Sequence, residues 1–78
     1  MRKSRWQLTK REEQILRLVA AGCEYKLIAS ELTCGESTIK FHVGQIILKL
    51  NAYNNRHAVA IALRKSLLAV SEIPELSE

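Results

Sequence analysis

Apolar residues recur along this chain at intervals of three and four positions, and alternation of apolar and polar residues is nearly absent. Spacing of this kind places the apolar side chains on one face of an α-helix. The segments that carry it are separated by short runs containing glycine or asparagine, and they lie at about 9–21, 25–32, 36–50 and 54–68. The pattern therefore predicts an all-α fold, a compact four-helix domain.

The first of these segments has a clear beginning and end. Thr9 followed by Glu12 forms a capping box, in which the threonine hydroxyl and the glutamate carboxylate each accept a hydrogen bond from the other residue's backbone. Gly22 suits the left-handed residue that follows a helix. The predicted helix has one apolar stripe, made of Ile15, Leu16, Val19 and Ala20.

The next two segments form a single motif. A short helix from Tyr25 to Leu32 and a longer one from Glu36 to Leu50 are joined by a turn at residues 33–35, where Gly35 can cap the second helix. Two helices joined in this way are typical of a helix-turn-helix, whose second helix enters the major groove of DNA.

The helix predicted over 36–50 has two unlike faces. Its core face consists of Ile39, Val43, Ile46, Ile47 and Leu50. Its other face consists of Ser37, Lys40, Phe41, Gly44, Gln45 and Leu48. Lysine can donate to guanine or to phosphate, glutamine can bond adenine, and phenylalanine can pack on a thymine methyl group. Phe41 could instead tuck against the domain's own edge. Gly44 costs a helix about 1 kcal/mol relative to alanine, which close approach to another surface would explain.

The last helical segment begins at a cap formed by Asn54 or Asn55. Its first apolar face consists of Ala58, Val59, Ala62 and Leu63, and Ile61 with Leu68 forms a second. We expect three regions: a flexible basic segment at 1–7, the folded domain at 8–69, and an acidic, mobile tail at 70–78. Trp6 is expected to fix the N-terminus onto the core beside Leu8.

The charge of the chain favours a polyanionic partner. The 78 residues carry twelve Lys and Arg against eight acidic residues, a net charge of +4. Three of the acidic residues lie in the tail, so residues 1–70 hold twelve basic and five acidic groups, a net charge of +7. A small domain with this balance attracts nucleic acid, although charge that only maintains solubility is the alternative.

Catalysis, metal binding and membrane insertion all lack support in the sequence. Cys23 and Cys34 form no CxxC pair, and with His42 and His57 they lack the spacing of a zinc site. No serine, cysteine or acid is placed to form a triad with His42. No apolar run approaches the ~20 residues of a membrane span, and no signal peptide is visible. We therefore expect no enzyme activity, no cofactor and no metal, in a reduced cytoplasmic protein associated with the nucleoid.

Four blocks of the chain closely resemble the LuxR-type DNA-binding domain, also called the NarL/FixJ or GerE type. They are LTKREEQILRLVAAG, KLIASEL, STIKFHVGQIILKLNA and HAVAIAL, and they cover about residues 8–68 with the family's spacing. The resemblance implies a four-helix domain whose second and third helices form the helix-turn-helix. It also implies a bacterial transcription regulator that binds double-stranded DNA, in a family whose DNA-binding domain often follows a receiver or ligand-sensing domain and sometimes stands alone.

The resemblance assigns candidate DNA contacts, of which Lys40 ranks first because it matches the family's basic position on the recognition helix. The other candidates match positions near base edges or phosphates, or lie on the same outward face: Phe41, Gly44, Gln45, Thr38, His42, Lys49, Lys26 and Ser37. The fourth helix of the family commonly carries a homodimer contact. That contact would here involve Ala58, Ile61, Ala62 and Leu63, although packing on the first and third helices is an alternative that explains Ala58, Val59 and Ala62.

The expected partners are double-stranded DNA, a second copy of the chain on that DNA, and RNA polymerase as a further candidate, with no membrane partner. A different class of function stays open. Region 4 of bacterial sigma factors has a similar helix-turn-helix and also binds proteins, and an adaptor that has weakened DNA binding is a related alternative. Glu24 and Leu48, which depart from the family pattern, and Gly44 would permit it.

Overall fold

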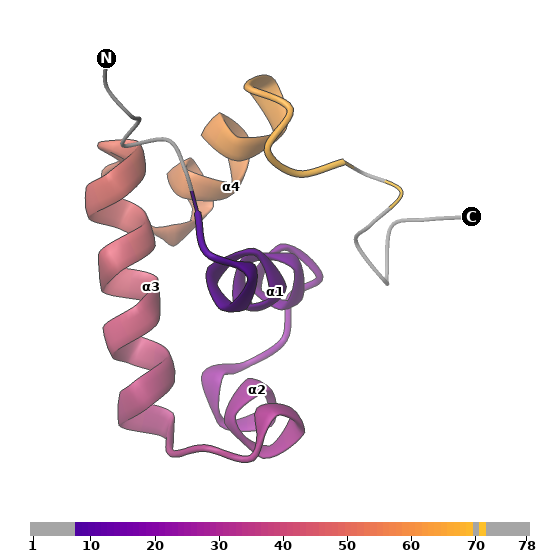
Figure 1. Ribbon diagram of the computed structural model, residues 1–78, viewed down its shortest axis with the longest axis vertical. Helices are drawn as coiled ribbons and strands as arrows, with labels where there is room; N and C mark the ends of the chain where they lie inside the picture. The colour runs from indigo at the N-terminus through magenta and orange to yellow at the C-terminus, as the bar shows by residue number, and fades with distance from the viewer. Residues whose placement is uncertain (1–7, 70, 72–78) are drawn as a thin grey trace.

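The computed structural model describes residues 8–69 and residue 71. Its helices are shown in Figure 1 and are α1 (Lys10–Ala20), α2 (Tyr25–Leu32), α3 (Glu36–Leu50) and α4 (Asn55–Arg64). No strand occurs among the described residues. The predicted all-α, four-helix domain is confirmed. The expectations for the basic segment 1–7, for Trp6 and for the tail beyond Ser71 lie outside the described residues.

Helix α1 begins at the predicted capping box. The backbone N–H of Glu12 donates to the Thr9 hydroxyl at 3.0 Å, and the backbone N–H of Thr9 donates to Glu12 Oε1 at 2.9 Å. These two bonds satisfy amides that have no partner within the first turn of a helix. At the other end Gly22 adopts a φ of 89°, as predicted for the residue after the helix.

The later helices end on the same left-handed conformation without glycine. Thr33 after α2, Asn51 after α3 and Ser66 after α4 have φ values of 57°, 54° and 61°. Each lets the next backbone N–H fold back onto the helix, as where the N–H of Cys34 donates to the carbonyl of Ala29 at 2.9 Å. This conformation reverses the chain direction sharply, so consecutive helices pack against each other.

Helix α4 is shorter than predicted. Asn54 is its cap, and its side-chain oxygen accepts from the backbone N–H of His57 at 2.9 Å. The helix ends at Arg64 instead of near Leu68, because the chain turns at Ser66. This turn returns Leu68 to the core, where it is 3% exposed.

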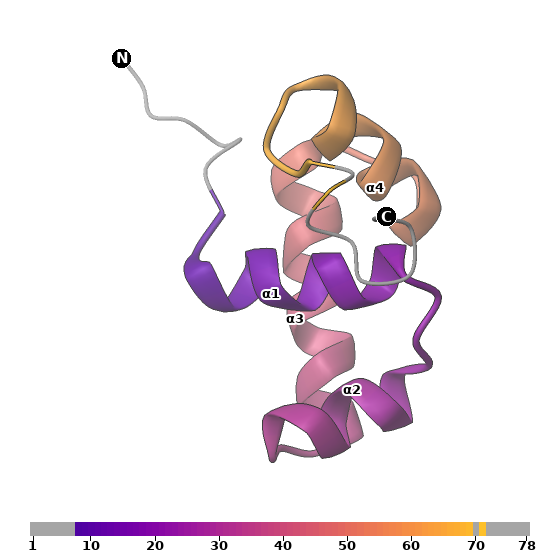
Figure 2. The same ribbon diagram turned by 90° about the vertical axis from the view of Figure 1, so that its right-hand side faces the viewer.

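Helix α3 stands along one side of the molecule, and the other three helices lie on its other side (Figure 1). Figure 2 shows α1 crossing α3 near its middle, with α2 beside the first half of α3 and α4 beside its far end. The core lies between them and includes Ile15, Leu16, Ile28, Ile39, Val43, Ile46, Leu50, Ala58, Ile61 and Ala62. Each large aliphatic side chain buried there contributes about 1.5–3 kcal/mol by leaving water. The row on α3 therefore fixes which face of that helix stays outside.

Candidate nucleic-acid interface

The outer face of α3 is open to solvent. Phe41 is 63% exposed and Leu48 is 73% exposed, and Ser37, Thr38 and Lys40 are exposed as well. The sequence left open whether Phe41 tucks against the domain, and the structure excludes that alternative. An α-helix with side chains is about 10–12 Å across, close to the ~12 Å width of the major groove. This face is therefore free to meet a surface of that shape.

Gly44 lies in the middle of this face, and the fold gives no reason for a glycine there. A Cβ built on Gly44 would meet nothing within 4 Å. Its backbone is helical and needs no left-handed conformation. The helix thus gives up about 1 kcal/mol of propensity at a position where the domain itself has room for alanine.

Two further predicted contacts flank the face. Gln45 and His42 are both half-buried. The His42 ring lies edge-on to Phe41, with ring centroids 5.9 Å apart and planes at 65°. An edge-to-face pair of this kind is favourable, so the histidine supports the phenylalanine from the side.

Lys49 does not lie free for phosphate. Its Nζ is 2.7 Å from Oε1 of Glu12, so this pair joins the last turn of α3 to the first turn of α1. Lys49 keeps 32% of its side chain exposed, whereas Glu12 keeps only 6%. The expected phosphate contact of Lys49 stays a prediction, and in the free domain its ammonium compensates a buried carboxylate, which would be costly to leave unpaired.

The same contacts set the charge state of Glu12. Burial raises the pKa of this carboxyl, but the hydrogen bonds from Lys49 and from the Thr9 backbone, with the lysine charge, outweigh burial. The pKa of Glu12 consequently lies below its ordinary value. The carboxylate is ionised at neutral pH, so the ion pair between α1 and α3 is present there.

Helix α2 contributes one candidate, Lys26, which is exposed in the first turn of the helix. Glu24 is the N-cap of α2 but makes no side-chain capping bond. The backbone amides at this end therefore lack a side-chain acceptor from the cap, and the first turn remains a place where an anionic group would be favoured. Leu27 beside Lys26 is 51% exposed.

The predicted dimer residues on α4 need a correction. Ala58, Ile61 and Ala62 are 1%, 5% and 0% exposed, because they pack into the domain's own core. They are therefore wrong as a contact surface for a second chain. Of the predicted set only Leu63 is half-exposed, although it also packs against the core; next to it on α4, Ala60 is exposed and Val59 is half-buried.

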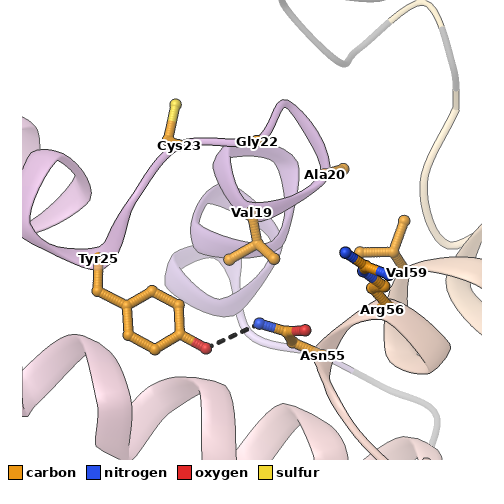
Figure 3. Close-up of a pocket in the computed structure, with 8 residues that line it drawn as sticks. All are labelled: Val19, Ala20, Gly22, Cys23, Tyr25, Asn55, Arg56 and Val59. Carbon is orange, nitrogen blue, oxygen red and sulfur yellow. Dashed lines mark hydrogen bonds between the residues drawn. The ribbon is translucent and has the colours of Figure 1, made fainter.

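A pocket of about 430 Å³ opens where α1, α2 and α4 meet (Figure 3). It is lined by Val19, Ala20, Gly22, Cys23, Tyr25, Asn55, Arg56 and Val59. The Asn55 side-chain amide donates to the Tyr25 hydroxyl at 2.9 Å across one side of it, while the Cys23 sulfur points away from this pair. The lining residues include no histidine and no carboxylate.

Several contacts that position these elements were not predicted from the sequence. The Lys49–Glu12 pair joins residues 37 positions apart, and the Tyr25–Asn55 bond joins residues 30 apart. Tyr53 stacks on His57 with ring centroids 5.0 Å apart. Only the last had a local signal, the spacing of four residues between two aromatic rings. The two long-range contacts depend on how helices cross, which no local pattern specifies.

Among residues 8–69 and 71, no three His, Cys, Asp or Glu side chains come together as a metal site. In the same part of the chain, no helix is both long enough and apolar enough to span a membrane.

Residues 6–62 match the family model of the bacterial regulatory proteins of the luxR family. The chain belongs to the LuxR family. That family consists of transcription regulators with a DNA-binding helix-turn-helix, and it is not a family of enzymes. The four helices of the structure agree with the LuxR-type domain.

Three relatives illustrate the similarity to LuxR-family regulators. The transcriptional activator protein CarR of Pectobacterium carotovorum subsp. carotovorum is 40% identical over 60 residues, which cover 77% of this chain and 25% of that protein. The uncharacterized transcriptional regulatory protein YvfU of Bacillus subtilis (strain 168) is 45% identical over 58 residues, covering 74% of this chain and 29% of that protein. YxjL of the same organism, also an uncharacterized transcriptional regulatory protein, is 40% identical over 60 residues, covering 77% and 28%.

The LuxR-type chain thus spans between a quarter and a third of the length of these relatives. No solved structure matches it significantly.

Proposed function

We propose that this domain binds double-stranded DNA sequence-specifically, with α3 in the major groove, and that two copies bind together to regulate transcription. The observation that carries the proposal is the free outer face of α3 in a chain of the LuxR family. The core of the domain holds α3 by its inner row of aliphatic residues, so the outer face can dock without any rearrangement.

The polar groups proposed to face DNA have matching groups on it. Lys40 can donate to guanine O6 and N7 or to a phosphate, and Gln45 can bond adenine in a bidentate manner. Ser37 and Thr38, in the first turn of α3, and Lys26, in the first turn of α2, can donate hydrogen bonds to phosphates. Lys49 contributes indirectly, since its pair with Glu12 fixes the crossing of α3 over α1.

Pairing of two copies would use the outward side of α4. Ala60 is exposed there, and Val59 and Leu63 are half-buried. A second α4 packed on these side chains would cover apolar area that the domain leaves in water. Two copies related by a two-fold axis would then present their α3 helices to half-sites about one helical turn apart.

The test is selection of bound duplexes from a random pool with the full chain, followed by binding measurements on the selected sequence. Because phosphate contacts release counterions, affinity should fall by about 40- to 150-fold between 50 and 200 mM salt if three or four phosphates are neutralised. Lys40→Ala should cost about 1–3 kcal/mol on the selected duplex and relax preference at one base pair.

Arg64→Ala, which removes an exposed cation from α4, is the matched control and should leave base preference unchanged. Enrichment of no sequence, together with affinity that does not respond to salt, would refute DNA binding and favour the protein-interaction alternative.

A further inference from the structure

Two large apolar side chains are exposed to solvent on the outer face of α3, the face that meets DNA in the proposed function. Phe41 and Leu48 are 63% and 73% exposed, more than any other large apolar side chain described except Tyr53. They are seven positions apart, close to two turns of helix, so they project from the same side of α3 about 10.5 Å apart along its axis. Neither contributes to the core of the domain.

We propose that Phe41 and Leu48 recognise the C5-methyl groups of two thymines in each half-site. The inference rests on the proposed function and adds the class of sequence that the helix selects. Thymine C5-methyl is the apolar group that a natural base pair presents in the major groove. A separation of about 10.5 Å corresponds to roughly three base-pair steps of about 3.4 Å.

The charge on α3 supports an apolar mode of recognition. Lys40 and Lys49 are the basic residues of this helix, and Lys49 is paired with Glu12. Lys40 therefore supplies the available positive charge, which leaves most of the base-facing surface to uncharged groups. Burying the two exposed apolar side chains against methyl groups would then provide binding energy that a more basic helix obtains from phosphates.

The residues between them fit the same target. Gly44 and Gln45 lie between Phe41 and Leu48 along the helix, and the space over Gly44 is open. A missing side chain there lets base edges approach the helix backbone. Gln45 can bond adenine, the partner of thymine, so one A·T pair can be recognised on both bases.

The ring of His42 orders the Phe41 side chain before it contacts DNA. The edge-on ring contact between them restricts the orientations of the Phe41 side chain. A side chain that is already ordered loses less conformational entropy on binding. Phe41 can therefore act as a preorganised apolar contact although it is exposed.

The experiment leaves the protein unchanged and alters only the methyl groups of the DNA. In the duplex selected by the full chain, each thymine is replaced in turn by deoxyuridine, which keeps every hydrogen-bonding group and lacks the methyl. Affinity should fall about fourfold at each of two positions roughly three base pairs apart, the equivalent of about 0.8 kcal/mol for one buried methyl-sized group. Replacement at other thymines should leave affinity within twofold.

Variants assign each methyl to a side chain. Phe41→Ala should weaken binding to the thymine duplex and abolish the effect of deoxyuridine at one position, and Leu48→Ala should do so at the other. Tyr53→Ala is the control, because Tyr53 is 90% exposed and lies outside α3. It should keep the full response to deoxyuridine at both positions.

The outcomes separate this inference from the proposed function. Salt-sensitive, sequence-specific binding that is unaffected by deoxyuridine would overturn methyl recognition and leave DNA binding intact. The same conclusion would follow if Phe41→Ala and Leu48→Ala bound like the unaltered chain, and these side chains would then be assigned to a protein surface. Failure to bind any duplex would overturn the proposed function and this inference together.

Discussion

Glu12 takes part in two contacts that serve different helices. Its backbone and carboxylate complete the cap of α1, and the same carboxylate oxygen binds Lys49 of α3. The capping box was predicted from the local spacing of Thr9 and Glu12. The ion pair was not, because Lys49 looked like any other lysine on a helix with a polar face. A single residue thus combines a local role that the sequence specifies with a tertiary role that only the helix crossing creates.

Lys49→Ala should destabilise the folded domain by about 1–2 kcal/mol, because it leaves the Glu12 carboxylate buried without its cation. This loss of unfolding free energy is smaller than that for breaking a fully buried ion pair, because Lys49 is 32% exposed and partly screened by water. Urea unfolding followed by circular dichroism measures it. Lys40→Ala, the same change at an exposed site on the same helix, should stay within about 0.5 kcal/mol. Equal losses from the two variants would contradict a special role for Lys49.

The pH dependence of stability should also report this pair. The pKa of Glu12 is lowered in the folded state, so its contribution is fully present above the ordinary glutamate value of about 4.3. The contribution is then lost as pH falls through the lower, folded pKa. Lys49→Ala should therefore show a shallower loss of unfolding free energy below about pH 4.3 than the unaltered chain. Parallel curves for the two proteins would argue against the ion pair.

The helix endings show what local patterns specify and what they miss. Gly22 predicted a left-handed residue just after the first helix, and Gly22 has that conformation two residues after the end of α1. Thr33, Asn51 and Ser66 adopt the same conformation, but only glycine is a strong sequence signal for it. The bounds of α2 and α3 were nevertheless predicted from apolar spacing. The end of α4 was placed too late, because apolar residues continue beyond it and return to the core by a turn.

Thr33→Gly should stabilise the domain by about 0.5–1 kcal/mol. A β-branched residue with a φ of 57° is strained by its Cβ, and glycine removes the strain at the cost of greater freedom in the unfolded chain. Gly22→Ala is the converse change at a φ of 89° and should destabilise the domain by a similar or larger amount. Thermal unfolding of both variants should give shifts of opposite sign. A lower melting temperature for Thr33→Gly would show that the threonine side chain stabilises the turn.

Gly44→Ala should change stability and DNA binding in opposite directions. The added methyl meets nothing within 4 Å in the domain, and alanine is a better helix former by about 1 kcal/mol, so the free energy of unfolding should rise. On the selected duplex the same methyl would hold base edges away from α3, and affinity should fall about tenfold, or about 1.4 kcal/mol. Unfolding and binding measured on one preparation test both. A more stable variant with unchanged affinity would show that α3 does not approach DNA closely at this position.

At the scale of the whole molecule, the face of α3 that stays outside was predictable because its inner row of aliphatic residues has helical spacing. The surface of α4 was not predictable in the same way. The sequence left Ala58 and Ala62 open between core packing and contact with a second copy, and both fill the core together with Ile61. Their spacing marks an apolar face, but whether a face meets the domain or a second chain depends on how α4 lies against α1 and α3. The outward candidates that the structure leaves are Val59, Ala60 and Leu63.

Leu63→Glu tests whether this outward side pairs two copies on DNA. A charge placed in an apolar contact would be unpaired there, so cooperative binding to a duplex with two half-sites should be lost, with overall affinity falling tenfold or more. Binding to a duplex with one half-site should stay within twofold, which also shows that the variant is folded. Gln14→Glu adds the same charge at an exposed site on α1 and should keep cooperativity.

Gel-shift titrations on the two duplexes distinguish these cases. If Leu63→Glu bound the paired sites as cooperatively as the unaltered chain, the contact between copies would have to lie elsewhere than at Leu63. Independent binding of the unaltered chain to the two half-sites would instead rule out pairing by this domain.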